Sequence, residues 1–290
     1  MNTHRRALLL GAGIAALLGP WMRLARAAEQ TDPKAYPSTN SADVMADEHM
    51  QAMRRAVGPG IWGEEQIAML LYPGFTALDL VGPHYFFACL FGAKVHLVTT
   101  GADLAPVPSD LGLAIAPSMK LADAPRDLDL LFFPGGTTGT LDVMTSESTM
   151  AWIADRAARC RLLTSVCTGS MILGKAGLLR GRRATSHWAT RAVLADFGAT
   201  PVDARVVQDG NVITGAGVSA GIDFALAVVE KLRGRPYAQA LMLQAEYSPA
   251  PPFKGGTLAD TPREVAGFMD DMLKPVADQF RAVARKPAIR

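Results

Sequence analysis

The sequence is short of cysteine and shows no cysteine pairing pattern. Its 290 residues include three cysteines, Cys89, Cys160 and Cys167, and no C-x-x-C pair. An odd number of cysteines in this arrangement indicates neither a disulfide framework nor a zinc knuckle, so at least one free thiol is expected. We expect Cys160 and Cys167 to lie on one extended strand, about 23 Å apart, which is beyond disulfide reach.

A basic surface is also missing from most of the chain. The formal net charge is +2 at pH 7, but residues 1–27 carry four arginines and no acidic residue, so the remainder has a charge of −2. Without a basic stripe, we expect no nucleic-acid partner. The glycines of GAGVSAG (215–221) lack the dinucleotide spacing and follow a late hairpin, which indicates a close-packed turn with Ser219 as a helix cap. We therefore expect neither a cofactor nor a metal.

The N-terminal apolar stretch is too short and too glycine-rich for a membrane span. Arg5-Arg6 precede an uncharged run from Ala7 to Met22, and Ala25-Arg26-Ala27 is a small-x-small cleavage pattern. This order predicts a twin-arginine type export signal over 1–27 and a periplasmic location, although His4 stands where Ser or Thr is usual. The alternative is a buried N-terminal helix.

From Gln66 the chain alternates short apolar strands with helices. Strands that are apolar on both faces and separated by helices predict an α/β fold, with a parallel-rich sheet covered by helices on both faces. We expect strands at 66–72, 94–100, 128–136 and 160–166, helices at 77–91, 148–158, 169–179 and 220–234, and an antiparallel hairpin at 204–217.

Composition divides the chain into four parts. The export signal is followed by a polar, proline-dotted leader with a short helix at 28–65. A catalytic domain is expected at 66–253. A proline-rich stretch and one amphipathic helix, beginning near Thr261-Pro262, form a C-terminal extension at 254–290.

The stretch LLTSVCTGSMILGKAGLL (162–179) carries the strongest chemical signal. A buried strand that passes at once into a helix needs a tight turn, which exposes the side chain at its tip at the carboxyl end of the sheet. Cys167 lies at this tip, where the amides of the following helix stabilise a thiolate. The spacing is that of a nucleophile elbow, with Gly169 two residues after the cysteine. A cysteine buried as a small hydrophobic residue is the alternative.

Three further positions bear on this site, and each has a structural alternative. The amides of the turn at Gly136 could form an oxyanion hole with the amide of Thr168, although such a turn is commonly only a turn. Asp79 begins a helix after the first strand, where aspartates commonly cap helices. His187 follows the cysteine by 20 residues, and a solitary histidine is more often structural than catalytic.

Together, in this order, the motifs resemble the ThiJ/PfpI family of the class I glutamine amidotransferase-like superfamily, and within it the isonitrile hydratase branch. The resemblance covers about Gln66 to Phe253. It implies a flavodoxin-like fold, with Cys167 as nucleophile, Asp79 as its acidic partner and Thr168 as a catalytic neighbour. His187 matches a histidine found near the cysteine in relatives. The matching segments are YPGFTALDLVGP, FFPGG, SVCTGSMILGKAGLLRGRRATSHW, VITGAGVSAGIDFAL and QAEYSPAPPF.

The resemblance implies an enzyme that acts on a small molecule and forms a homodimer. In the expected reaction, the Cys167 thiolate attacks the terminal carbon of an isonitrile while the nitrogen takes up a proton, giving a thioimidate that water converts to an N-substituted formamide. Asp79 would act first as acid and then as base, and the Thr168 hydroxyl would orient the water.

Three other functions are compatible in principle with a nucleophile elbow of this kind. Amidase, deglycase or peptidase chemistry is possible, but peptidase-like relatives carry histidine where this chain has Thr168. The sensor half of a transcription factor would need a DNA-binding part, and the stretch after Thr261 is too short for one. A non-catalytic redox sensor, with Cys167 oxidised reversibly, is consistent with the sequence.

Overall fold

The computed structural model describes residues 47–285, and side chains from residue 51 onward. The predicted export signal and the first part of the leader lie outside the described residues. The described residues from Glu48 onward form one compact unit. Within residues 47–285, no helix combines the length and the apolar character needed to cross a membrane.

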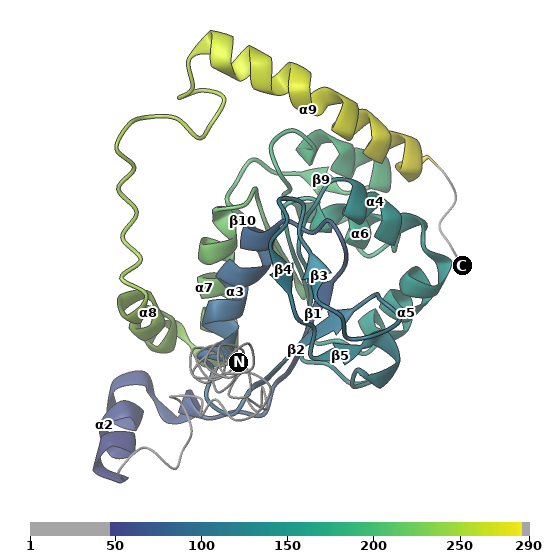
Figure 1. Cartoon of the computed structure of the whole chain (residues 1–290). Helices are drawn as coiled ribbons and strands as arrows, with labels where there is room; N and C mark the ends of the chain where they lie inside the picture. Colours follow the sequence, from purple (N-terminus) through teal and green to yellow (C-terminus); the bar gives the residue numbers. More distant parts are fainter. Residues whose placement is uncertain (1–46, 286–290) are drawn as a thin grey trace, which may run out of the picture. The chain divides into compact units, whose positions relative to one another are not determined.

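A seven-stranded sheet forms the centre of this unit, as Figure 1 shows. Its strand order is β10-β11-β7-β6-β1-β2-β5, and every neighbouring pair is parallel except the β10–β11 hairpin. The expected α/β class, with a mostly parallel sheet and a late antiparallel hairpin, is therefore confirmed. The strands are β1 (Gln66–Leu71), β2 (Lys94–Thr99), β5 (Met119–Lys120), β6 (Leu130–Phe133), β7 (Leu162–Val166), β10 (Val206–Asp209) and β11 (Val212–Gly215).

The central strands are buried on both faces, as their unbroken apolar runs predict. All residues of β6 and β7 are buried, and so are all but the first of β1. Cys160 and Cys167 flank β7 rather than lying on it, and no disulfide joins cysteines within the described residues. Two short pairs lie outside the main sheet: β3 (Val107–Pro108) with β4 (Ala114–Ile115), and β8 (Arg183–Ala184) with β9 (Thr200–Pro201).

Helices cover both faces of the sheet. In Figure 1, α3 and α7 lie on one side of it, with α4, α5 and α6 on the other. The helices are α2 (Asp47–Val57), α3 (Ala77–Ala88), α4 (Thr138–Thr145), α5 (Glu147–Ala157), α6 (Gly169–Lys175), α7 (Ala220–Arg233), α8 (Arg235–Gln244) and α9 (Arg263–Ala284), with 3-10 turns η2 (Pro59–Ile61), η3 (Leu121–Asp123) and η4 (Arg191–Phe197).

Two helices differ from the expectation. Only one helix was expected near 148–158, but α4 precedes α5, and Ser146 separates them by accepting a hydrogen bond from the Thr149 amide at 3.3 Å. The helix α8 was not expected at all. Gly234, at φ 86°, ends α7, and Pro236 in the first turn of α8 starts the new helix.

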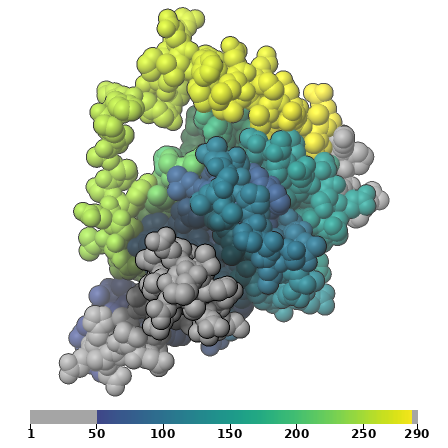
Figure 2. All heavy atoms as spheres, in the orientation of Figure 1, coloured from purple at the N-terminus to yellow at the C-terminus, as the bar shows by residue number. Residues whose placement is uncertain are grey.

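The C-terminal extension makes few contacts along its first part. Residues 248–260 are exposed, and Figure 2 shows an opening between this segment and the body of the unit. The helix α9 then packs against α4, α6 and η4, with Phe280 fully buried. The apolar face of α9 is thus buried in the second half of the helix.

A buried ion pair joins the end of α7 to the chain just before β1. The Arg233 Nε donates to Glu65 Oε1 at 2.8 Å, and the remaining guanidinium hydrogens go to a second carboxylate oxygen and to backbone carbonyls, including Ile61 O at 2.9 Å and Phe91 O at 3.1 Å. Arg233 and Glu65 are only 7% and 9% exposed. Since all five donors have partners, the guanidinium holds together the segments that carry these acceptors.

We expect Arg233→Ala to lower the free energy of unfolding by about 3–5 kcal/mol, because it leaves a buried carboxylate unpaired. The matched control is Arg235→Ala. Arg235 pairs with Glu230 at 2.8 Å on the surface, so its loss should change stability by no more than about 1 kcal/mol. Urea unfolding followed by circular dichroism measures both. Equal changes in the free energy of unfolding for the two substitutions would show that the buried ion pair does not stabilise the fold.

Candidate active site

Cys167 occupies a strained turn between β7 and α6. Its φ of 59° is in the left-handed region, which a non-glycine residue rarely adopts. Its amide donates to Ala216 O at 2.9 Å, and its carbonyl accepts from Ser170 Oγ at 2.9 Å and from Ser186 Oγ at 3.0 Å. These bonds hold the turn that the sequence predicted.

The glycine after the cysteine is required by close packing. A Cβ on Gly169 would lie 2.2 Å from Phe133 O, at the end of the neighbouring strand β6. Only glycine lets the start of α6 approach the sheet this closely. The Cys-Thr-Gly order therefore places the thiol at the carboxyl end of the parallel strands, where the following turn of β6 also lies.

Asp79 lies beside the thiol and does not cap α3. It is fully buried, and its Oδ2 accepts a hydrogen bond from the Gly135 amide at 3.0 Å. Burial raises the pKa of Asp79 to about 7, partly offset by hydrogen bonds with the Cys167 side chain and the Gly135 amide. Its Oδ1 has no hydrogen-bond partner within the described residues. The carboxyl can therefore gain or lose a proton near neutral pH.

The thiol of Cys167 is held in its neutral form at rest. Burial raises its pKa well above the usual value, and the nearby Asp79 carboxyl raises it further. Hydrogen bonds from the backbone amides of Thr168 and Val218 lower the pKa but do not outweigh burial. The sequence predicted that the amides of the following helix favour the thiolate, and the Thr168 amide does lower the pKa of Cys167, but burial outweighs it. The helix amides are present, but a desolvated sulfur beside a carboxyl keeps its proton.

Thr168 and Gly136 bind each other instead of facing the sulfur together. The Gly136 amide donates to Thr168 Oγ1 at 2.9 Å, and Thr168 Oγ1 donates to Gly136 O at 2.5 Å. The Gly136 amide, expected in the oxyanion hole, is thus occupied by a side chain. The second backbone donor at the sulfur is the amide of Val218, in the GAGVSAG turn. The close glycine spacing of this turn is the only feature of the sequence that could have pointed to this donor.

A buried chain of hydroxyl groups supports Thr168 from behind. Thr140 Oγ1 lies 3.2 Å from Thr168 Oγ1 and 3.0 Å from the Tyr72 hydroxyl, which donates to Pro134 O at 2.7 Å. Since the Thr168 hydrogen goes to Gly136 O, the hydroxyl has no second hydrogen for a water molecule. The geometry makes Thr168 a positioning residue for the Gly136 turn.

We expect Thr168→Val to lower the free energy of unfolding by about 1–3 kcal/mol, because the Gly136 amide loses its buried acceptor, whereas Gly136 O keeps the Thr140 hydroxyl as a donor at 3.0 Å. Thr168→Ser keeps the hydroxyl and should stay within about 1 kcal/mol of the unmodified chain. Thermal and urea unfolding of the two variants provides the comparison. A valine variant as stable as the serine variant would show that the hydroxyl does not hold this turn.

His187 lies near the site without a hydrogen bond to Cys167 among the described residues. Its Nδ1 accepts from the Ala189 amide at 3.4 Å, and its ring packs so closely on Gly217 that a Cβ there would lie 2.7 Å from His187 Cδ2. Burial, with the charge of Arg191, lowers its pKa. The ring is therefore neutral at pH 7 and supports the turn that carries Val218.

No group of three potential metal ligands occurs among the histidine, cysteine, aspartate and glutamate residues within 47–285. The arrangement instead offers a thiol, a carboxyl of raised pKa and two backbone donors at one buried position. This set can form a covalent bond through sulfur and pass a proton between sulfur and carboxyl.

Known proteins are similar to this chain in sequence and in fold. The profile of the DJ-1/PfpI family matches residues 65–231. An isonitrile hydratase from Pseudomonas putida is 48% identical over 216 residues, which cover 74% of this chain and 92% of that protein. This alignment is longer than the expected domain at 66–253, so the likeness extends into its flanks. The "Parkinson disease protein 7 homolog" of Danio rerio is 32% identical over 151 residues, covering 50% of this chain and 80% of that protein.

Solved structures of other proteins are also similar to this chain. The crystal structure of a ThiJ/PfpI family protein from Pseudomonas syringae matches with a TM-score of 0.78 and 49% identity, covering 83% of this chain and 98% of that chain. The crystal structure of Drosophila melanogaster DJ-1beta, at 22% identity and a TM-score of 0.57, covers 64% of this chain and all of that chain. The second likeness bears on the fold alone.

Proposed function

We propose that this chain, which belongs to the DJ-1/PfpI family, adds water to an isonitrile and releases an N-substituted formamide. The observation that carries the proposal is the buried Cys167–Asp79 pair, in which a carboxyl of pKa about 7 contacts a neutral thiol. The likeness to the Pseudomonas putida isonitrile hydratase supports the choice of substrate class. The pair supplies a nucleophile and a proton carrier in contact, which is what the reaction needs.

In the first step, Asp79 as a carboxylate takes the thiol proton while sulfur attacks the terminal carbon of R–N≡C. The carbon then carries a lone pair, and the protonated Asp79 returns the proton to it. The product is the thioimidate R–N=CH–S–Cys167. The first proton thus ends on the carbon of the thioimidate, and not on the nitrogen as the sequence analysis expected.

In the second step, Asp79 is again a carboxylate and takes a proton from water as the water oxygen adds to the thioimidate carbon. Asp79 passes this proton to the nitrogen and then takes the remaining hydroxyl proton as the carbonyl forms, the carbon–sulfur bond breaks and R–NH–CHO leaves. The amides of Thr168 and Val218 donate to the sulfur as it regains negative charge. The thiol then recovers its proton from Asp79, so the cycle consumes one isonitrile and one water.

The test is formamide production by the purified full chain from a panel of isonitriles, followed by chromatography. The proposal predicts one formamide per isonitrile consumed. A folded chain with a reactive Cys167 that converts no member of the panel would overturn it. Reversible oxidation of Cys167 by peroxide, without turnover, would then favour redox sensing. Turnover of amide or glycated substrates would favour another cysteine-dependent hydrolase or deglycase.

We also propose that the chain forms a homodimer and is exported. The helix α3 presents Leu78, Val81 and Tyr85 to solvent, at 44%, 39% and 41% exposure, along one stripe. We propose that a second copy covers this stripe, and sedimentation that gives a monomer at micromolar concentration would refute it. The arginine pair before the apolar run supports export through residues 1–27, which fractionation of the producing cells tests.

A further inference from the structure

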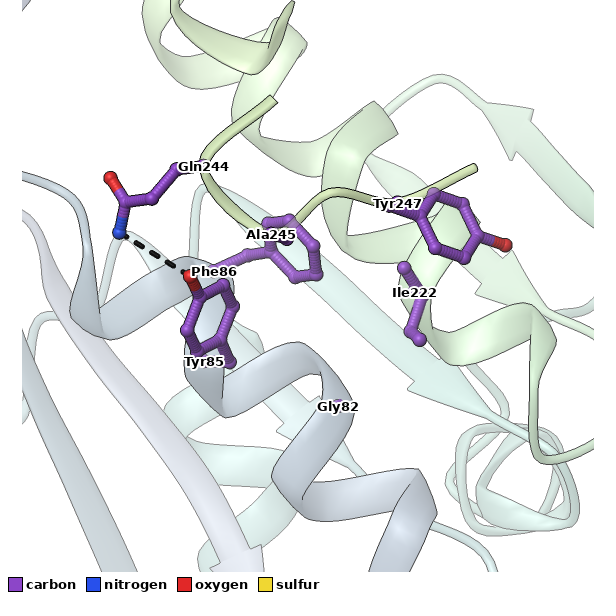
Figure 3. A pocket seen from close by; sticks show the side chains of 7 residues that line it. All are labelled: Gly82, Tyr85, Phe86, Ile222, Gln244, Ala245 and Tyr247. Atoms are coloured by element: carbon purple, nitrogen blue, oxygen red, sulfur yellow. Dashed lines mark hydrogen bonds between the residues drawn. The ribbon is translucent and has the colours of Figure 1, made fainter. Parts of the chain in front are cut away.

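Asp79 is fully buried, so packed groups rather than an open cavity surround its carboxyl. The pocket of about 360 Å³ in Figure 3 lies further along α3, from Gly82 onward, and its walls include neither Asp79 nor Cys167. The titratable groups that interact with the Asp79 carboxyl are Cys167, Asp110 and Tyr72. Cys167 takes part in the proposed reaction, whereas the mechanism above gives Tyr72 no role.

A single peptide group joins Tyr72 to Asp79. The Tyr72 hydroxyl donates to Pro134 O at 2.7 Å, and the Gly135 amide donates to Asp79 Oδ2 at 3.0 Å. Pro134 O and the Gly135 N–H belong to the same peptide group, which is planar and turns only as a whole. A hydrogen bond at the oxygen therefore fixes the direction in which the N–H points.

This peptide group lies directly against both reacting side chains. A Cβ on Gly135 would lie 2.6 Å from Asp79 Oδ2 and 2.7 Å from Cys167 Cβ, so the approach requires glycine. Gly135 O accepts from the Thr76 amide at 2.8 Å, one turn before Asp79 at the start of α3. A rotation of the Pro134–Gly135 peptide therefore changes its contact with the Asp79 carboxyl directly.

Tyr72 is a permanent donor to this peptide group. It directly follows β1, it is 1% exposed, and its hydroxyl also lies 3.0 Å from Thr140 Oγ1. Burial raises the pKa of Tyr72 above its usual value, and the hydrogen bond with Thr140 offsets this only in part. The hydroxyl keeps its hydrogen across the neutral pH range, so it donates in both protonation states of Asp79.

We propose that Tyr72 is a positioning residue, whose hydroxyl holds the Pro134–Gly135 peptide so that the Gly135 N–H stays directed at Asp79. A donor at the peptide oxygen also polarises the peptide and strengthens the hydrogen bond at its N–H. A hydrogen bond to a carboxylate favours the charged form, and that form takes the proton in both steps of the reaction. The catalytic consequence rests on the proposed hydratase function, which gives Asp79 this role.

The test is Tyr72→Phe, which removes the hydroxyl and keeps the ring. Because the peptide is then free to turn, the Gly135 hydrogen bond weakens, and the pKa of Asp79 should rise from about 7 to between about 7.5 and about 8. Infrared spectroscopy of the full chain measures this pKa as the pH midpoint of the carbonyl stretch of the protonated carboxyl, and Asp79→Asn identifies the band. Below pH 7, kcat/KM for isonitrile hydration should fall by about three- to tenfold.

The matched control is Tyr237→Phe. Tyr237 is also buried, and its hydroxyl donates to Cys89 O at 2.9 Å and accepts from the Phe91 amide at 3.1 Å, at the opposite end of α3 from Asp79. Its loss should lower stability in urea unfolding as Tyr72→Phe does, because each removes a buried hydroxyl that binds backbone. It should leave the infrared midpoint and the pH profile unchanged.

The outcomes separate this proposal from the hydratase function. A folded Tyr72→Phe chain with the same infrared midpoint as the control would overturn the positioning role. If Tyr72→Phe does not fold, Tyr72→3-fluorotyrosine decides, because it keeps the hydroxyl and makes it a stronger donor. The midpoint should then fall below that of the unmodified chain, and an unchanged midpoint would overturn the role. The expected midpoint shifts in a chain that produces no formamide would refute the hydratase function and leave the link from Tyr72 to Asp79 intact.

Discussion

Replacing Cys167 by alanine should abolish formamide production, with a loss of at least about 10⁴-fold in kcat, the scale seen when a covalent nucleophile is removed. The physical reason is that carbon–sulfur bond formation has no substitute at this position. The Asp79 carboxyl would remain, but a carboxylate is a poor nucleophile toward an isonitrile carbon. The measurement is formamide accumulation at saturating isonitrile, with protein folding checked by circular dichroism.

Cys160→Ala is the matched control for this experiment. Cys160 is also buried, but its thiol donates to Leu162 O at 3.1 Å, away from Asp79. We expect this variant to retain its activity within a few-fold and to lose about 1 kcal/mol of stability. Turnover by the Cys167→Ala chain at a rate comparable with the control would remove the cysteine from the mechanism.

Asp79→Asn should lower kcat by about 10³-fold, because asparagine cannot carry the proton in either step. In the unmodified chain, the reactive form of the pair carries one proton, so kcat/KM should rise as the pH increases toward about 7, the pKa of Asp79. The pH profile below 7 measures this. In the Asp79→Asn variant, kcat should fall and kcat/KM should no longer rise with pH. If kcat/KM of this variant still rises toward pH 7, a group other than Asp79 titrates.

The same substitution has an effect on stability with a definite sign. The pKa of Asp79 is raised from its usual 3.8 to about 7 in the folded chain, so the folded state binds this proton more tightly than the unfolded state. This contribution is complete below about pH 3.8 and is lost as the pH rises through about 7. It amounts to about 4 kcal/mol. Relative to the unmodified chain, Asp79→Asn should therefore gain stability between pH 4 and pH 8 in urea unfolding.

The sequence predicted the elements whose signals are local. The buried run before Cys167 and the small residues after it define a strand, a turn and a helix within one short segment, and the structure forms all three. Gly169 is explained by its contact with Phe133 O. The parallel pairing follows from the alternation of apolar strands with helices, so the fold class was also accessible, whereas the strand order was not predicted.

The parts that sequence reasoning missed depend on three-dimensional contacts. The occupation of the Gly136 amide by Thr168 joins residues 32 positions apart, and no local pattern reveals it. Val218 contributes a backbone amide, which carries no side-chain signal. The raised pKa of the Cys167 thiol follows first from the burial of the thiol itself and then from the Asp79 carboxyl beside it, whereas the sequence showed only the favourable helix amides.

The covalent mechanism can be tested by the mass of the intact protein after acid quenching at times from milliseconds to seconds during turnover. Because a thioimidate retains every atom of the substrate, we expect a species heavier by the mass of one isonitrile, with the label mapped by peptide digestion to Cys167. The same label on another residue, or sustained formamide production with no labelled protein at any time, would contradict it.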